Sequence, residues 1–323
     1  MCLLMGTTCV ELLQARQDTL FMSVLNSRKH RLGARDNPTV GLFVSTDGGT
    51  TWNHKGWTGY IRIFYTEAGT DGNIWSACGN GVLRSTDGGN SWRITTGWQV
   101  TEVLKIKVDA RAPGTAYAAT AYGVFKTENG GETWQEHNRG FLKPFVSDIV
   151  IDKQQSARLL AATEDGVYLS SDGGTVWHRA GIDGRGVRTV AQHPTIKDLF
   201  FVGTEDDGVF ISRDGGKNWT AANNGLKHLT VYSIACDRSN PDVLYLGTHG
   251  GGVYRSSDGG KSWQQKAEGL GNLVVHSIVM LPSNSSVVFA GTLNGGIFKS
   301  TDGGDHWNFN SQEEAQVWGL WAR

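Results

Sequence analysis

An eight-residue phrase recurs seven times along this chain, and its regular spacing limits the fold more than any other feature. Successive copies lie 40 to 44 residues apart, an interval typical of propeller blades and solenoid repeats. A repeat array turns length into a number of units, so the 323 residues predict one domain of seven similar units. The phrase reads Ser/Thr-x-Asp/Asn-x-Gly-x-x-Trp, and its third position is occupied by Asp47, Asp87, Asn129, Asp172, Asp214, Asp258 and Asp302.

Three columns of short apolar segments align when the copies are superposed on this third position. The segments are bounded by Gly, Asp and Asn and show no helical period, which predicts strands joined by hairpins and an all-β fold. The first column covers residues 60–64, 103–107, 146–150, 187–191, 231–235, 275–279 and 317–321. The second covers 20–24, 74–76, 116–118, 159–161, 200–202, 244–246 and 288–290. The third covers 41–44, 81–83, 123–125, 166–168, 208–210, 252–254 and 296–298.

The order of the columns favours a closed ring over an open stack. Each column holds seven members only if the last segment, 317–321, joins the second- and third-column strands that begin near Leu20. Such closure leaves no unpaired sheet edge between the chain ends. We therefore expect a monomeric seven-bladed β-propeller over residues 19–323, with its C-terminal strand completing the N-terminal blade.

Two segments depart from the repeat. Residues 1–18 form an N-terminal extension, in which residues 3–8 resemble a second-column strand, so an alternative register or a partial eighth blade stays open. Residues 26–39 form a basic insertion within the first blade. A charged insertion of this kind is usually solvated, although it could dock an acidic partner.

The repeated phrase itself is best explained as a structural turn. Its carboxylate can accept backbone N–H groups, its glycines supply positive φ, and its Trp can pack back onto the sheet. The alternative is that these Asp residues are catalytic groups or calcium ligands. That alternative is disfavoured because a site is needed once, whereas these residues occur once in every blade around a ring.

The phrase resembles the Asp-box of BNR-repeat propellers, with six copies that match it and Asn129 as a variant. Proteins with similar repeats include sialidases, xyloglucan-degrading glucanases, the sortilin ectodomain and a photosystem II assembly factor. The resemblance implies a propeller with the Asp-boxes at one rim and binding on the opposite face. It implies no single activity, because one fold carries many functions.

The face opposite the Asp-boxes should collect the segments before the first-column strands and the turns between the second and third columns. Aromatic side chains beside charged ones at such a place are typical of a surface that recognises a protein or a glycan. The alternative is that the aromatic residues only fill space between blades. The residues that we predict for ligand binding are Trp57, Trp98, Phe145, Arg185, Arg188, His228 and Trp318.

Evidence for an enzyme is weak. The nearest segment to the Arg-Ile-Pro motif of sialidases is Arg62-Ile63-Phe64, which lacks the proline. A glycoside hydrolase needs two carboxyl groups about 5 to 9.5 Å apart, and Asp148 with Glu205 is the pair that we weigh for this role. The leading hypothesis is a non-catalytic binding or assembly scaffold, and the alternative is a glycoside hydrolase or carbohydrate-binding propeller.

Composition excludes several other classes. The net charge of −1 provides no field that would recruit nucleic acid. The sequence contains no run of 18 apolar residues, so no transmembrane helix is predicted. The four Cys and nine His show no metal-binding spacing, so we expect no metal and no cofactor. Residues 1–13 make a poor secretory signal, so a cytoplasmic location is expected unless a signal has been removed, in which case the protein is secreted or periplasmic.

Overall fold

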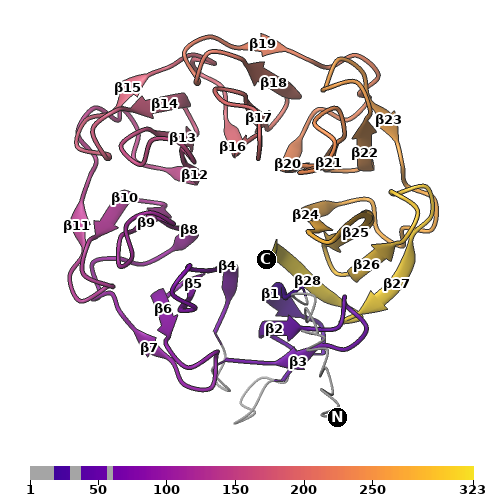
Figure 1. Cartoon of the computed structure of the whole chain (residues 1–323), viewed down its shortest axis with the longest axis horizontal. Helices are drawn as coiled ribbons and strands as arrows, with labels where there is room; N and C mark the ends of the chain where they lie inside the picture. Colours follow the sequence, from indigo (N-terminus) through magenta and orange to yellow (C-terminus); the bar gives the residue numbers. More distant parts are fainter. Residues whose placement is uncertain (1–17, 30–37, 57–60) are drawn as a thin grey trace, which may run out of the picture.

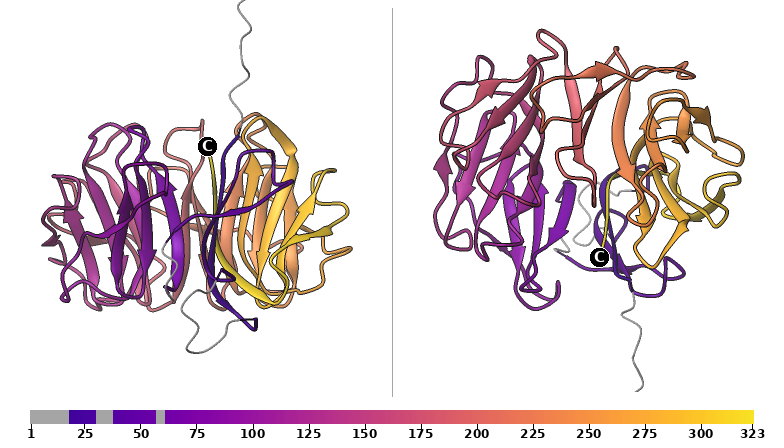
Figure 2. Two further views of the ribbon diagram at one scale, coloured as in Figure 1. Left: turned by 90° about the horizontal axis from the view of Figure 1, so that it is seen from below. Right: turned by 45° about the horizontal axis from the view of Figure 1, so that its top comes forward.

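The computed structural model describes residues 18–29, 38–56 and 61–323. These residues form seven four-stranded antiparallel sheets, arranged as blades around a central channel (Figure 1). In side view the strands of every blade run roughly along the channel axis (Figure 2). The predicted seven-bladed, all-β propeller is therefore confirmed, and the described residues contain no helix.

Each blade contributes one inner strand to the wall of the channel. Blade 1 consists of β28 (Ala315–Ala322), β1 (Leu20–Ser27), β2 (Gly41–Ser45) and β3 (Asn53–His54). Blade 2 consists of β4 (Ile63–Ala68), β5 (Ile74–Cys78), β6 (Gly81–Ser85) and β7 (Arg93–Ile94). Blade 3 consists of β8 (Val103–Val108), β9 (Ala116–Thr120), β10 (Gly123–Thr127) and β11 (Gln135–Glu136). Blade 4 consists of β12 (Val146–Ile151), β13 (Leu159–Thr163), β14 (Gly166–Ser170) and β15 (His178–Arg179).

The remaining three blades repeat the same order from the channel outwards. Blade 5 consists of β16 (Val187–Gln192), β17 (Phe200–Thr204), β18 (Val209–Ser212) and β19 (Thr220–Ala221). Blade 6 consists of β20 (Val231–Cys236), β21 (Leu244–Thr248), β22 (Gly252–Ser256) and β23 (Gln264–Gln265). Blade 7 consists of β24 (Val275–Leu281), β25 (Asn284–Thr292), β26 (Gly296–Ser300) and β27 (Asn308–Ser311).

The ring closes where the sequence predicts. Strand β28 pairs with β1 along its length, from Leu20 opposite Ala322 to Ser27 opposite Ala315. Two backbone bonds between Thr19 and Arg323, 3.0 and 3.1 Å long, extend the seam beyond the strands. The two chain ends thus share one sheet, which removes the open edge that a linear array would leave.

The register predicted for the inner strand of blade 2 was wrong. That strand begins at Ile63 and ends at Ala68 instead of covering 60–64, which places Thr66 where the other blades carry an apolar residue. The Thr66 hydroxyl lies 2.8 Å from that of Ser76 and 3.1 Å from that of Ser23. Because these bonds satisfy a buried polar group, the position tolerates Thr, and the apolar pattern that marks the register elsewhere is lost here.

The expectations for the N-terminal extension lie outside the described residues, which begin at 18. This holds for the strand-like segment 3–8 and for a partial eighth blade. Most of the basic insertion falls at 30–37, which is also outside them. The boundary between extension and propeller at 18/19 accordingly remains a prediction.

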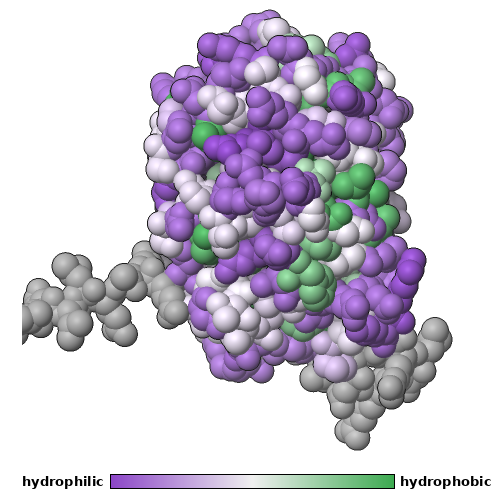
Figure 3. Space-filling model, turned by 90° about the vertical axis from the view of Figure 1, so that its right-hand side faces the viewer, coloured by the Kyte–Doolittle hydropathy of each residue, from purple (hydrophilic) through white to green (hydrophobic). Residues whose placement is uncertain are grey.

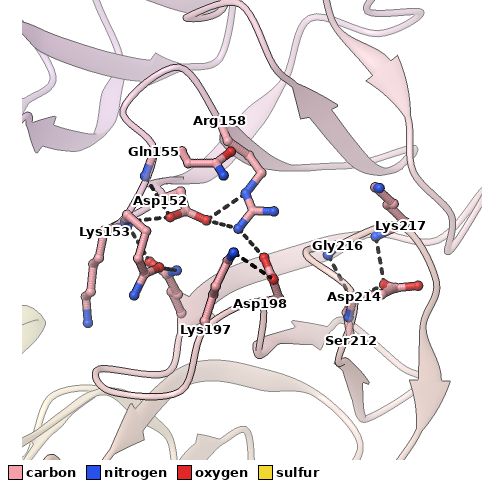
Figure 4. Close-up of polar contacts among 12 residues, drawn as sticks. Asp152, Lys153, Gln155, Arg158, Lys197, Asp198, Ser212, Asp214, Gly216 and Lys217 are labelled. Atoms are coloured by element: carbon pink, nitrogen blue, oxygen red, sulfur yellow. Dashed lines mark hydrogen bonds and ion pairs between the residues drawn. The ribbon is translucent and has the colours of Figure 1, made fainter.

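The repeated phrase forms the turn between the third and fourth strands of each blade. In blade 1 the Ser45 hydroxyl donates to Asp47 at 2.8 Å and accepts the Gly49 N–H at 2.9 Å. Asp47 also accepts the Thr51 hydroxyl at 2.6 Å, and this bond is the main reason that the pKa of Asp47 falls to about 2. The turn at Asp214 repeats the two contacts of the Ser hydroxyl, and Asp214 also accepts the Lys217 N–H (Figure 4). The carboxylate is thus occupied within its own turn, as expected for a structural role.

Charged side chains also tie blade 4 to blade 5. Arg158 donates from Nε to the buried Asp152 at 2.7 Å and also reaches Asp198 in the next blade (Figure 4). Burial of the ion pair inside the rim makes it less sensitive to salt than an exposed pair would be. The blade interface at this point is therefore polar as well as apolar.

Candidate functional site

The entrance to the channel on the face opposite the Asp-boxes is lined by one residue from each blade. Strand pairing is antiparallel throughout, so each inner strand begins at the end of the blade away from the Asp-box turn. In six of the seven inner strands the pairing register shifts across the second residue, and in β28, which begins two residues earlier, it shifts across the fourth, as in a β-bulge. The seven residues at this shift, called the mouth ring below, line the channel: Phe64, Leu104, Ser147, Arg188, Tyr232, His276 and Trp318.

One part of the mouth ring is a continuous arc of aromatic side chains. The His276 imidazole stacks on Trp318, with centroids 4.3 Å apart, and on Tyr232, at 4.8 Å. Phe64 meets the Trp318 indole edge to face at 5.8 Å, and His249 meets Tyr232 similarly at 5.9 Å. Such contacts hold the rings in fixed orientations. Four neighbouring blades therefore present a pre-ordered aromatic surface.

The rest of the mouth ring is polar or aliphatic. Ser147 donates to the Val187 carbonyl at 2.7 Å, so its hydroxyl joins blade 4 to blade 5. Arg188 forms an ion pair of 2.5 Å with Glu205. The aromatic arc and this polar segment make the mouth asymmetric, although the backbone beneath it is nearly seven-fold.

Below the mouth ring, the third residues of the inner strands β4, β8 and β12 form a buried network. The Lys105 ammonium lies 3.7 Å from the Tyr65 ring centroid and 3.6 Å from an Asp148 oxygen. Asp148 also accepts the Thr189 hydroxyl at 3.0 Å. Burial lowers the pKa of Lys105, and Asp148 opposes this effect. Burial likewise raises the pKa of the Tyr65 hydroxyl.

A second ion pair lies next to this network. Lys107 bonds to Glu67 at 2.7 Å, and its ammonium is 5.3 Å from the Tyr65 centroid. The charges in this part of the wall are therefore matched within the protein. A charged ligand is therefore not needed to balance them.

Several polar atoms in the channel wall have no partner within the described part of the chain. They are buried atoms of residues that line the channel: Arg188 Nε, His276 Nε2, Ser233 Oγ and Ser277 Oγ. Burial lowers the pKa of His276 to about 4, with a smaller effect from His249, so the imidazole is neutral near pH 7. Buried polar groups usually have a partner, so these atoms are exceptions within the wall.

The structure places the predicted site residues at different parts of the molecule. Arg188 and Trp318 belong to the mouth ring, whereas Trp57 lies outside the described residues. Trp98 is 86% exposed, and Phe145 is half-buried directly before β12. Arg185 lies 3.4 Å from Asp207, and His228 bonds to the Tyr254 hydroxyl at 2.9 Å. A role in binding remains a prediction for all seven residues.

Sequence reasoning missed Phe64, Tyr232 and His276. Tyr232 and His276 stand second in correctly aligned first-column segments, so a comparison of the second positions in the sequence would have found them. For Phe64 the wrong register of β4 concealed the equivalence. The lesson is that the variable position within a repeated strand deserves more weight than the constant ones.

The two carboxylates weighed for hydrolysis have separate partners. Asp148 is 4% exposed and contacts Lys105 and Thr189 inside the wall. Glu205 is exposed and pairs with Arg188 on the mouth ring. Among the described residues, no group of three or more His, Cys, Asp or Glu side chains is placed to hold a metal ion. The catalytic role of this pair stays an untested alternative.

Comparison with known proteins agrees with the architecture. The BNR/Asp-box repeat family matches residues 43–54 and 210–221. The chain is a BNR-type β-propeller. Nothing beyond this superfamily is assigned, because the matched segments are short, and no match was found among curated protein sequences.

Solved structures similar to this propeller belong to proteins of different kinds. YCF48 bound to D1 peptide has a TM-score of 0.64 at 18% identity, over 88% of each chain. The GH74 xyloglucanase from Xanthomonas campestris has a TM-score of 0.64 at 15% identity, over 76% of this chain and 44% of its own. The extracellular domain of the putative one component system BT4673 from B. thetaiotaomicron has a TM-score of 0.68 at 15% identity, over 86% of this chain and 38% of its own.

These likenesses extend to the fold alone. The propeller spans 31% to 44% of the length of three similar GH74 chains. Over residues 18–29, 38–56 and 61–323, the structure offers no helix able to span a membrane. The outer rim over blades 6 and 7 is mostly hydrophilic, with small separate hydrophobic groups (Figure 3).

Proposed function

We propose that this propeller is a non-catalytic binding platform that holds an extended segment of a partner protein across the channel mouth. The carrying observation is the stacked arc of Phe64, Trp318, His276 and Tyr232. Rigid aromatic rings give a large contact area at a low cost in conformational entropy, and they dominate protein-binding sites.

The polar groups near the arc support a peptide as the ligand. A peptide offers a backbone N–H and C=O at every residue, which could pair with the partly exposed Glu205 carboxylate and Arg188 guanidinium. The ion pair of Arg188 with Glu205 keeps the adjacent surface near neutrality, so the contact should depend more on stacking and hydrogen bonds than on net charge. The YCF48 propeller bound to a D1 peptide shows that this fold can hold a peptide.

A glycan is the second candidate, because aromatic rings also stack on sugars and because GH74 enzymes share the fold. In that case Asp148 and Glu205 are the carboxylates to test for hydrolysis. Their separate ion pairs favour the non-catalytic role.

The experiment is a selection of peptides from a random phage-displayed library on the wild-type protein, followed by anisotropy titration of the enriched peptides. Trp318→Ala should weaken binding by tenfold or more, since it removes the ring between His276 and Phe64. Phe309→Ala is the matched control, because Phe309 is an exposed aromatic residue on the outer strand β27, 52% exposed, and it should bind as wild type.

Three outcomes would overturn the proposal. Failure to enrich any peptide would reject a peptide platform, and equal binding by Trp318→Ala would reject the mouth ring as its site. Reducing ends released from an oligosaccharide panel by wild type, but not by Asp148→Asn, would establish the hydrolase instead.

A further inference from the structure

Neighbouring blades meet at a recurring seat formed by an Asp-box Trp and the loop that leaves the preceding blade. Three seats are alike: Trp177 against blade 3, Trp263 against blade 5 and Trp307 against blade 6. In each, the Trp backbone N–H bonds to a carbonyl of the preceding loop at 2.8 or 2.9 Å, and the indole Nε1–H bonds to another at 2.8 or 2.9 Å. These three side chains are only 1% to 3% exposed.

An apolar side chain fills each of these three seats. Phe141 stacks on Trp177 with centroids 4.9 Å apart and also meets Tyr168 of the same blade. Leu226 and Leu270 pack in the clusters of Trp263 and Trp307. A Gly precedes each of these side chains, and the loop comes so close that a Cβ at Gly140 would lie 2.0 Å from the Trp177 carbonyl.

The seat between blades 4 and 5 is built differently. Its loop, residues 180–184, has one residue more between β15 and the equivalent Gly, and Ile182 adopts a φ of 58°. A Cβ at Gly184 would meet nothing within 4 Å. The Trp219 indole donates to Gly216 of its own turn at 3.2 Å. Within the described residues, no backbone bond joins Trp219 N to this loop, although Gly181 approaches the indole so closely that a Cβ there would lie 3.2 Å from Trp219 Cδ1.

Arg185 occupies the position that Phe141, Leu226 and Leu270 hold in the other seats. Its guanidinium carbon is 5.5 Å from the Phe210 centroid, much as Phe141 contacts Tyr168, and it lies 3.4 Å from Asp207. Ile182 of the same loop packs in the cluster of Trp219 and Phe210. A cavity of about 360 Å³ lies beside this seat, lined by Ile182, Arg185, Phe210, Lys217 and Trp219, among others. Much of its lining comes from the loop after β15 and the segment before β19, two strands at the outer edge of the ring (Figure 1).

The charges of the lining define the chemistry of the cavity. Arg185 and Lys217 are cationic, and the acidic Asp183 already contacts Arg179 at 3.7 Å. No ion pair joins Lys217 to an acid in the described part of the chain, although its backbone N–H bonds to Asp214. The cavity thus combines two aromatic side chains with two cations, of which Arg185 also contacts Asp207 at 3.4 Å and Lys217 has no ion pair within the described residues.

We propose that this cavity binds a small planar aromatic carboxylate, with its ring against Trp219 and Phe210 and its carboxylate between Arg185 and Lys217. Arginine pairs favourably with carboxylates, and the Trp219 and Phe210 rings provide apolar faces against which a flat ligand can stack. The pocket is small and partly apolar with a few polar groups, as ligand sites usually are. It is separate from the mouth ring, so it does not depend on the function proposed above.

The test uses benzoate as the probe and the indole N–H signals of the full-length protein in ¹⁵N NMR spectra. Benzoate should shift the Trp219 signal, assigned with Trp219→Phe, in a saturable way, and should leave the Trp263 signal unchanged because Leu226 fills that seat. Benzamide, which has the same shape without the charge, should bind at least tenfold more weakly.

Arg185→Leu is the decisive variant, because it removes the guanidinium and places there the residue type found at Leu226 and Leu270. It should abolish the benzoate response of the Trp219 signal. The Trp263 signal should keep its wild-type position and the thermal unfolding temperature should not fall, which would show that the fold is intact. Lys217→Ala should weaken benzoate by several-fold. The proposal is overturned if the Trp219 signal does not respond, if benzamide acts as strongly as benzoate, or if Arg185→Leu responds like wild type.

Discussion

The imidazole of His276 lies 4.3 Å from the Trp318 indole, centroid to centroid, with only 20° between the ring planes. The two residues come from different blades, β24 and β28, and their contact spans the junction between blade 7 and the blade that closes the ring. Because stacked rings restrict each other, this contact fixes part of the proposed binding surface before any ligand arrives. Stacking and burial also determine how the mouth responds to pH.

Protonation of His276 should destabilise the protein. Its pKa is lowered from the model-peptide value of 6.5 to about 4, chiefly by burial, so the unfolded chain binds the proton first. The contribution of neutral His276 to the free energy of unfolding is fully present above pH 6.5 and is lost as pH falls towards 4. We expect wild type to lose about 2 kcal/mol more than His276→Phe over this interval. Denaturant unfolding at both pH values measures the difference, and parallel losses in the two proteins would contradict it.

Removal of the Asp148 charge should destabilise the channel wall, whatever the activity of the protein. Asp148→Asn leaves the Lys105 ammonium without its acid at 3.6 Å, and stranding a buried charge costs about 3 kcal/mol. The double variant Lys105→Met/Asp148→Asn should recover part of this loss, because the unpaired cation is gone. Urea unfolding of the set tests this coupling. If Asp148→Asn were as stable as wild type, the pair of Lys105 and Asp148 would contribute nothing to the free energy of unfolding.

Gly319 is required where the closing strand meets blade 2. A Cβ at this position would lie 2.5 Å from the Phe64 carbonyl oxygen and 3.1 Å from the Tyr65 Cα. Backbone atoms cannot move aside as a flexible side chain can, so Gly319→Ala should lower the free energy of unfolding by about 2–3 kcal/mol. Gly79→Ala is the matched control, since its Cβ would meet nothing within 4 Å. Thermal unfolding of the two variants should separate them clearly, and equal midpoints would refute the close approach.

One Asp-box can be improved. Val176 stands where Thr51 donates its hydroxyl to Asp47 at 2.6 Å, so Asp172 receives only the backbone N–H of Val176 at that position. Val176→Thr should add the missing bond, lower the pKa of Asp172 further and stabilise the protein by about 0.5–1 kcal/mol. Thr51→Val should have the opposite effect in blade 1. Calorimetry at pH 7 checks both signs, and a Val176→Thr variant less stable than wild type would contradict the equivalence of the two turns.

The sequence alone determined the number of blades, the strand order within them and the closure of the ring. The strand order and the Asp-box turn recur in all seven blades. Each Asp-box turn is closed by bonds among residues only two to four positions apart, such as Ser45 to Asp47 and Ser45 to Gly49. Local bonds of this kind are specified by local sequence. An error arose where the repeat itself was broken, at the polar Thr66 of β4.

Only the tertiary structure decided which side chains meet. Trp318 contacts Phe64 from almost the other end of the chain, and a cavity lies beside Trp219 where one loop carries an extra residue. Such contacts depend on the angles between blades and on where each β-bulge directs its side chain, and neither is encoded within a single repeat. The scaffold follows from what the seven units share, whereas the candidate sites arise from how their differences are brought together around the ring.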